Sequence, residues 1–450
     1  MKRNNMILGI LLSMAAGPVC AQGIWTMDQC MKYAVDHCTE MKKQQIEIQR
    51  SHDQYRAAAA SFFPTLQAAV DGQYNWGRNI NPESNTYGNV TTFNNYYELY
   101  ATLNVFDGFA TLNAFKQARL SKSSSQTTLQ KIRDDKSIEV MQKYVDAAYA
   151  QACITLAEEK LKDSQQLLTK TQRLMELGEK SRPDIAQIEA QVAEDHYNLT
   201  HQKNVCQQAM IALQSSMNFP VKDTIQINVS VTDSKPQIES DNANAIYDSF
   251  RKWSPEVLAV EFNVKNSQYN YQIQKAKMLP SIILRGGIAT NYYRNLSQKG
   301  EYEPFHSQFH NNQGEYVVLT VSFPLFMPSQ WRKIREARSD WQETQISLNE
   351  TCRKLHDNIA LAVADRDGYL KELLQMRRKV ASDSVACYLS LRKYDEGMLS
   401  TFDLHSSTQT LLESRIKLLQ MQMMYILKKK LVDYYKGQPL IADNKLKTKK

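Results

Sequence analysis

The sequence lacks the marks of an enzyme or a metal protein. It contains no glycine-rich phosphate loop and no nucleophile elbow. Its eight histidines share no spacing with acids or cysteines that would suggest a catalytic triad or a metal site. The cysteines stand singly or eight positions apart on helical patterns, which favours buried small hydrophobes over a disulfide framework. We therefore predict a protein that is not an enzyme and needs no cofactor.

Long hydrophobic runs are also missing. Beyond residue 21 we find no stretch of about 18 apolar residues, so no transmembrane helix is predicted. The start resembles an export signal, with Lys2 and Arg3 before an apolar stretch and Val19-Cys20-Ala21 as a cleavage site. We predict that residues 1–21 are a signal peptide. An exported chain without a helical span is either soluble or a β-barrel.

No strong charge of one sign marks the body of the chain. The sequence holds 55 basic and 47 acidic residues. Two of the basic residues belong to the predicted signal peptide, and four lysines lie in a C-terminal tail, residues 439–450. The rest is nearly neutral, so we expect no nucleic-acid partner.

Glycine and proline are absent from long stretches. Residues 109–177 contain neither, and residues 329–436 contain no proline and only Gly368 and Gly397. A continuous helix over the first stretch would measure ~100 Å. Gly178 and Gly397 interrupt the two helical patterns in the same place, and an aspartate restarts each pattern six residues later. The sequence predicts two long helical hairpins with tips near 178–184 and 397–403.

The chain is internally duplicated. Residues Arg173, Gly178, Ser181 and Asp184 recur 219 positions later as Arg392, Gly397, Ser400 and Asp403. We predict a first repeat at 22–220 and a second at 254–438. Each repeat holds a helix, a strand pair and a hairpin. A small strand-and-turn insertion separates them at 221–253.

Alternating apolar and polar residues predict four strands, at about 66–76, 94–106, 281–293 and 314–326, with polar loops at 77–93 and 294–313. Runs of about ten residues with aromatics near their ends fit transmembrane barrel strands. A soluble sandwich would show similar alternation, and the pattern alone leaves both open. Four membrane strands cannot close a barrel, so a membrane reading requires an oligomer.

Several local motifs in this order resemble the TolC-type outer-membrane efflux proteins. They are Phe63-Pro64 and Leu279-Pro280 before the strands, Asn104 to Gly108 and Phe323 to Phe326 after them, and the two hairpin tips. The resemblance implies an α+β membrane protein of a Gram-negative outer membrane. It further implies a homotrimer in which four strands per chain make a twelve-stranded β-barrel, continued by a periplasmic α-barrel. Members are passive exit ducts, gated at the periplasmic end. They are recruited by an inner-membrane pump through a periplasmic adaptor.

The resemblance also implies roles for residues at the tips. Asp403 matches a carboxylate ring at the periplasmic pore entrance, although Ser406 replaces the second acid of the family. The alternative is that Asp403 only stabilises the start of its helix. Asp184 and Tyr394 match residues that hold the pore closed, although Leu399 replaces a basic residue of that constraint. Candidates for adaptor contact are Gly178, Ser181, Gly397, Ser400 and Thr401.

Two other protein classes remain open at this stage. A periplasmic adaptor would be exported and would contain a helical hairpin, but one hairpin flanked by compact β-domains. A soluble coiled-coil protein would need no detergent.

Overall fold

The computed structural model describes residues 24–81, 85–220, 222, 225–228, 239–297 and 302–441. The predicted signal peptide, much of the insertion and most of the basic tail lie outside these residues. Two compact units contain the described chain. The hairpin unit lies within Met1–Met41, Ile132–Tyr247 and Asn358–Lys450, and the sheet unit within Lys42–Lys131 and Asp248–Asp357.

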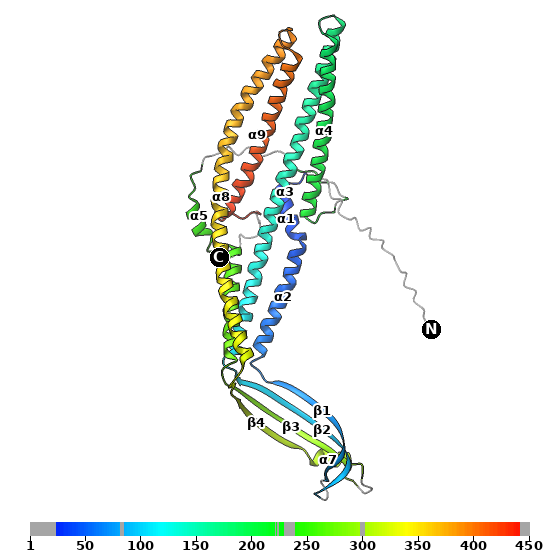
Figure 1. Cartoon of the computed structure of the whole chain (residues 1–450), viewed down its shortest axis with the longest axis vertical. Helices are drawn as coiled ribbons and strands as arrows, with labels where there is room; N and C mark the ends of the chain where they lie inside the picture. The colour runs from blue at the N-terminus through cyan, green and yellow to red at the C-terminus, as the bar shows by residue number, and fades with distance from the viewer. Residues whose placement is uncertain are drawn as a thin grey trace, which may run out of the picture. The chain divides into compact units, whose positions relative to one another are not determined.

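Two helical hairpins form the largest part of the hairpin unit, as the sequence predicts (Figure 1). The first joins α3 (Ala110–Glu176) to α4 (Arg182–Ser216), and the second joins α8 (Pro328–Asp395) to α9 (Thr401–Tyr435). The first parts of α3 and α8 belong to the sheet unit. Of the described helices, none is long and apolar enough to cross a membrane.

The core of the hairpin unit forms where the N-terminus and the insertion meet the long helices. Met31 of α1 (Met27–His37) is buried with Met141 of α3, Leu213 of α4 and Ile227. The Tyr144 hydroxyl donates to the carbonyl oxygens of Trp25 (3.1 Å) and Asn228 (2.9 Å), which holds the two segments together. Of the cysteines, Cys30, Cys38, Cys153, Cys206 and Cys352 are buried as free thiols, in line with the prediction.

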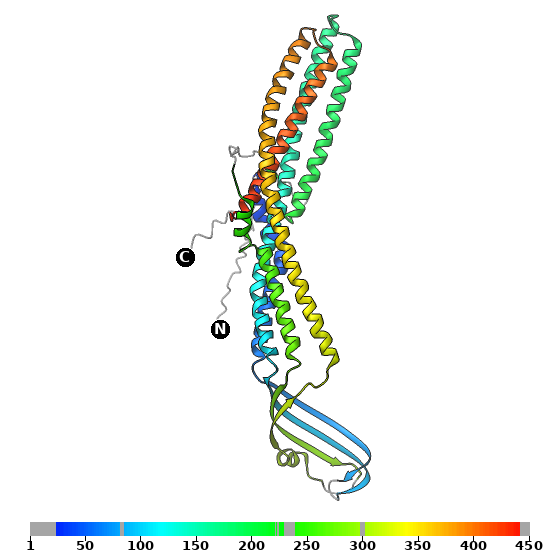
Figure 2. The same ribbon diagram turned by 60° about the vertical axis from the view of Figure 1, so that its left-hand side comes forward.

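The sheet unit holds a single antiparallel sheet in the order β1-β2-β3-β4 (Figure 2). Its strands are β1 (Thr65–Asn81), β2 (Thr86–Phe106), β3 (Ser281–Asn295) and β4 (Gly314–Ser322). Helices α2 (Thr39–Ala60) and α6 (Pro255–Ala276) precede the two strand pairs. Ser254 caps α6 and Pro255 stands in its first turn, where its missing N–H and fixed φ suit a helix start.

The strands differ in length from the prediction. Residues 77–93 were expected to be a loop, but β1 and β2 stay paired without a break to Asn81 and Thr86. Part of the expected loop 294–313 is also replaced, because β3 continues to Asn295 and a short helix, α7 (Phe305–Asn311), follows. β4 ends at Ser322 rather than near 326, since Pro324 cannot donate a ladder hydrogen bond.

Two helices differ as well. The helix that the sequence predicts before the first strand pair is divided into α1 and α2 at Cys38, whose backbone is extended. The expected strand-and-turn insertion contains α5 (Ala243–Phe250). Of the strand expected in this segment, the structure describes only residues 225–228, where Ile227 forms an isolated parallel bridge with Trp25.

Candidate functional site at the hairpin tips

Both hairpin tips begin with a glycine that ends a helix. Gly178 and Gly397 have φ values of +81° and +73°, in the left-handed region that favours glycine. At the first tip the Gly178 amide donates to the Met175 carbonyl and the Glu179 amide to the Leu174 carbonyl, both at 2.9 Å. Gly397 and Met398 repeat this pattern at the second tip. The two bonds form the Schellman motif, in which a left-handed glycine ends the helix.

A serine and an aspartate then start the next helix at each tip. Ser181 precedes α4, and its hydroxyl donates to Asp184 Oδ2 at 2.6 Å. The Ser400 hydroxyl donates to Asp403 Oδ2 at 2.6 Å and accepts from the Asp403 amide at 3.1 Å. These bonds satisfy groups that a helix start otherwise leaves free. Hydrogen bonds from the Ser181 hydroxyl and amide hold the pKa of Asp184 below its ordinary value.

The two hairpins touch through four contacts near the tips, which we name the tip contacts. The Thr401 hydroxyl lies 3.2 Å from Asp184 Oδ1, to which it donates. The Tyr394 hydroxyl lies 3.0 Å from Thr171 Oγ1, and Lys180 Nζ lies 4.2 Å from the centre of the Tyr394 ring. Lys170 Nζ lies 2.5 Å from Asp395 Oδ1. All four contacts join the first hairpin to the second within one chain.

The tip contacts separate the residues singled out by the sequence into two groups. Asp184, Tyr394 and Thr401 take part in them, and Tyr394 is completely buried. Asp403, Ser181 and Ser400 are exposed, and the hydrogen bonds of Asp403 stay within its own helix start. Sequence reasoning missed Thr171, Lys180, Lys170 and Asp395. The pairing of Lys170 with Asp395 carries no local sequence signal, because more than two hundred residues separate them.

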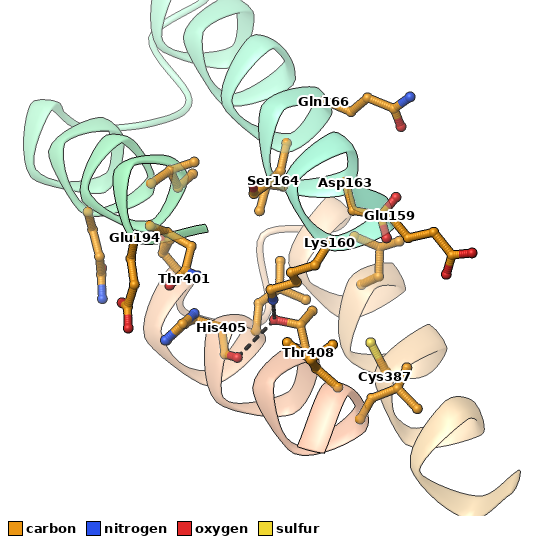
Figure 3. A pocket seen from close by; sticks show the side chains of 18 of the residues that line it. Glu159, Lys160, Asp163, Ser164, Gln166, Glu194, Cys387, Thr401, His405 and Thr408 are labelled. Carbon is orange, nitrogen blue, oxygen red and sulfur yellow. Dashed lines mark hydrogen bonds between the residues drawn. The ribbon is translucent and has the colours of Figure 1, made fainter. Parts of the chain in front are cut away.

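A cavity of about 560 Å³ lies between the two hairpins (Figure 3). Thr401, which takes part in the tip contacts, is one of the residues that line it. In it, Lys160 Nζ donates to Thr408 Oγ1 at 2.7 Å, and burial lowers the pKa of Lys160. Asp195, next to the lining residue Glu194, is buried, and this burial raises its pKa. Asp195 Oδ2 and His405 Nδ1 are buried without a hydrogen-bond partner among the described residues. The described residues contain no cluster of acids, histidines and cysteines able to hold a metal ion.

The sheet unit has one apolar and one polar face. On the apolar face Leu66, Val70, Trp76, Leu99, Val317 and Leu319 are all exposed. On the other face Arg285 donates to both carboxylate oxygens of Glu98 at 2.9 Å and stacks 3.8 Å from the centre of the Tyr100 ring. Tyr316 also donates to Glu98. A large exposed apolar face is unusual for a soluble protein and typical of a surface that meets lipid or another chain.

The comparisons with known proteins agree with this architecture. The profile of the family described as "Outer membrane efflux protein" matches residues 34–218 and again 246–426, one match for each predicted repeat. The chain belongs to the outer membrane efflux protein family. Membership places it in the outer membrane of a Gram-negative cell, extending into the periplasm, among channel proteins rather than enzymes. It also decides against the adaptor and the soluble coiled-coil protein.

Individual relatives are distant in sequence and close in fold. The chain is 22% identical over 366 residues to the "Proteases secretion protein PrtF" of Dickeya chrysanthemi, which covers 79% of this chain and 75% of the relative. The crystal structure of CusC matches with a TM-score of 0.79 at 17% identity, covering 92% of both chains. The outer membrane protein VceC of Vibrio cholerae matches with a TM-score of 0.78 at 14% identity, covering 92% of this chain and 96% of that one.

Proposed function

We propose that this member of the family is the exit duct of a tripartite efflux or type I secretion system. In this proposal three copies form a channel that passively conducts substrates from the periplasm to the exterior. The driving force comes from an inner-membrane pump, which reaches the channel through a periplasmic adaptor. The name of PrtF refers to protease secretion, which is compatible with a protein substrate.

One observation carries the proposal: the sheet has two open edges and an exposed apolar face. Among the described strands, β1 and β4 each pair with one neighbour only. Unpaired backbone groups in lipid cost several kcal/mol each, so open edges are not tolerated there. Pairing β4 of one copy with β1 of the next closes the ring and covers both edges along the length of β4. Three copies supply twelve strands, above the minimum of about eight for a barrel.

The tip contacts support a gate at the periplasmic end. They join the two hairpins of a chain by hydrogen bonds, a cation–π contact and an ion pair. In the proposal these contacts hold each subunit in the closed arrangement, and opening separates the second hairpin from the first. Asp184 and Tyr394 thus restrain the gate, and three Asp403 carboxylates at the pore entrance favour cations.

The tips also offer a surface for the adaptor. Leu177, Met398 and Phe402 are large apolar side chains that stand exposed beside Ser181 and Ser400. Exposed apolar side chains surrounded by polar ones favour contact with another protein. We propose that these residues, with the polar ones named from the sequence, contact the adaptor.

The experiment that tests the duct is extraction of the protein from membranes, with the native mass and the conductance in planar bilayers as readouts. We expect a species that requires detergent, has the mass of three chains and conducts ions. A monomer that stays in solution without detergent would leave both sheet edges unpaired and would overturn the proposal.

A further inference from the structure

The short helix α7 lies beside the part of β3 that β4 is too short to reach. β3 pairs with β4 only from Ser281 to Ala289, although β3 continues to Asn295. Along the uncovered part, the Tyr293 amide donates to Gln308 Oε1 at 2.9 Å, and Gln308 Nε2 donates to the Tyr293 carbonyl at 3.1 Å. The Asn312 side chain donates to the Asn291 carbonyl at 2.9 Å. Side chains on and beside α7 therefore satisfy the edge of β3 that a longer β4 would have paired.

Helix α7 also covers part of the apolar face. The Phe309 ring lies 5.2 Å from that of Tyr97, and the Phe305 ring lies 5.4 Å from that of Tyr292. The Thr290 hydroxyl donates to the Phe309 carbonyl at 2.7 Å. Tyr97, Tyr292 and Thr290 share the face that carries Leu99. The helix is therefore fixed on this face and is not a loose plug on the polar side.

A difference in strand length makes α7 important beyond its own chain. β1 has seventeen residues and β4 only nine. If β4 of one copy pairs with β1 of the next, at least eight residues of that β1 have no strand opposite them. The excess lies at the end of β1 far from the helices, because β1 begins and β4 ends at the junctions with helices. At that end, the element beside β3 is α7.

The two surfaces that would meet there are both aromatic and exposed. On β1, Trp76 is 76% exposed and its ring stacks on that of Tyr74. On α7, Phe305 and Phe309 remain 46% and 39% exposed after packing on the sheet. Burying such rings against each other is favourable through their area and their edge-to-face geometry. We propose that α7 is the seat for the far end of β1 from a neighbouring copy, with Tyr74 and Trp76 packing on Phe305 and Phe309. This inference rests on the proposed trimer.

Site-specific photo-crosslinking in native membranes tests the contact. Benzoylphenylalanine replaces Trp76, the cells are irradiated, and the linked peptides are identified by mass spectrometry. We expect a link between two copies that ends in residues 302–313. The same probe at Leu319 of β4 should link to β1 of another copy, and at Tyr96 on the polar face of β2 it should give no link to α7.

The two positions separate the inference from the proposed function. A link from position 319 to a second copy, with only a lipid product or no product from position 76, would contradict the contact between α7 and β1. It would still support the trimer. No link between copies from either position contradicts the trimer itself.

A second measurement does not depend on crosslinking. Trp76→Ala and Phe309→Ala should each lower the temperature at which the detergent-solubilised oligomer dissociates. The double variant should lower it no further than the larger single effect, because the two side chains lose the same contact. Tyr96→Ala is the matched control and should leave that temperature unchanged. Additive effects of the two variants would show that the rings do not meet.

Discussion

At the scale of single residues, Tyr394 connects the two hairpins most completely. It is buried, its hydroxyl pairs with Thr171, and Lys180 covers its ring. Loss of a neutral hydrogen bond costs about 1 kcal/mol, or roughly a fivefold change in an equilibrium. We expect Tyr394→Phe to raise the ratio of the open to the closed arrangement by about that factor for each subunit, measured in single-channel recordings. Tyr388→Phe is the control, because the Tyr388 hydroxyl bonds only Arg392 of the same helix among the described residues.

The contact between Asp184 and Thr401 gives a second test of the gate. We expect Asp184→Ala and Thr401→Val each to raise the open probability, since both remove the same hydrogen bond between the hairpins. The double variant should open the channel little more than the stronger single variant. If all three variants conduct like the wild type, this contact does not restrain the gate.

Asp403 is best tested by removing its charge and keeping its helix start. Asp403→Asn retains a side-chain oxygen for the bond from Ser400. If three carboxylates act on the pore, the variant should lose cation selectivity, measured as a smaller reversal potential across a salt gradient. Glu396→Gln removes another exposed carboxylate near the tip and is the control. If the reversal potential of Asp403→Asn is unchanged, Asp403 does not act on the pore and only stabilises the start of its helix.

The buried Asp195 predicts a dependence of stability on pH. Burial raises its pKa in the folded state above the ordinary value, so folding favours the protonated form. The free energy of unfolding should therefore increase as the pH falls toward the ordinary pKa of an aspartate. It should decrease as the pH rises from there through the raised pKa of the folded state. Asp195→Asn should be more stable than the wild type at pH 8 and lose part of this pH dependence. Asp163→Asn, at an exposed carboxylate of α3, should not.

At the scale of elements, replacing a glycine by alanine should change stability in opposite directions at a hairpin tip and inside α8. Gly397 has φ of +73° with nothing near its missing side chain, so Gly397→Ala costs about 1–2 kcal/mol through the backbone alone. Gly368 lies in mid-helix with equally open space, so Gly368→Ala should stabilise by about 0.5–1 kcal/mol. Amide hydrogen exchange at the second tip should accelerate in the first variant only. The same sign in both variants would contradict the left-handed cap.

The elements also show where sequence reasoning succeeds. The hairpins and their tips could be predicted, because the absence of glycine and proline and the Gly-to-Asp spacing are local signals. The extra length of β1 and β2 could not, because Gly77, Gly88 and Asn89 favour turns in isolation and are held in strands by pairing across the hairpin. Helix α7 has only seven residues, too few to show a helical period.

At the scale of the whole molecule, the family and the general role follow from the order of the elements, while the tip contacts do not. Thr171 and Tyr394 meet across 223 positions. The sequence around Thr171 and the sequence around Tyr394 contain no local pattern that predicts this pairing. The polar group of Arg285, Glu98 and Tyr316 likewise draws on three strands whose register is set only when the sheet forms.

Every tip contact joins two hairpins of the same chain. In the proposed gate, these contacts therefore hold a subunit closed without using side chains of a neighbouring copy. In the proposed trimer, a subunit that loses its tip contacts can move while the other two stay as they are. Single channels should then pass through intermediate conductance levels instead of switching once between shut and fully open. Mixed trimers carrying one, two or three Tyr394→Phe subunits should populate these levels in proportion to the number of altered chains.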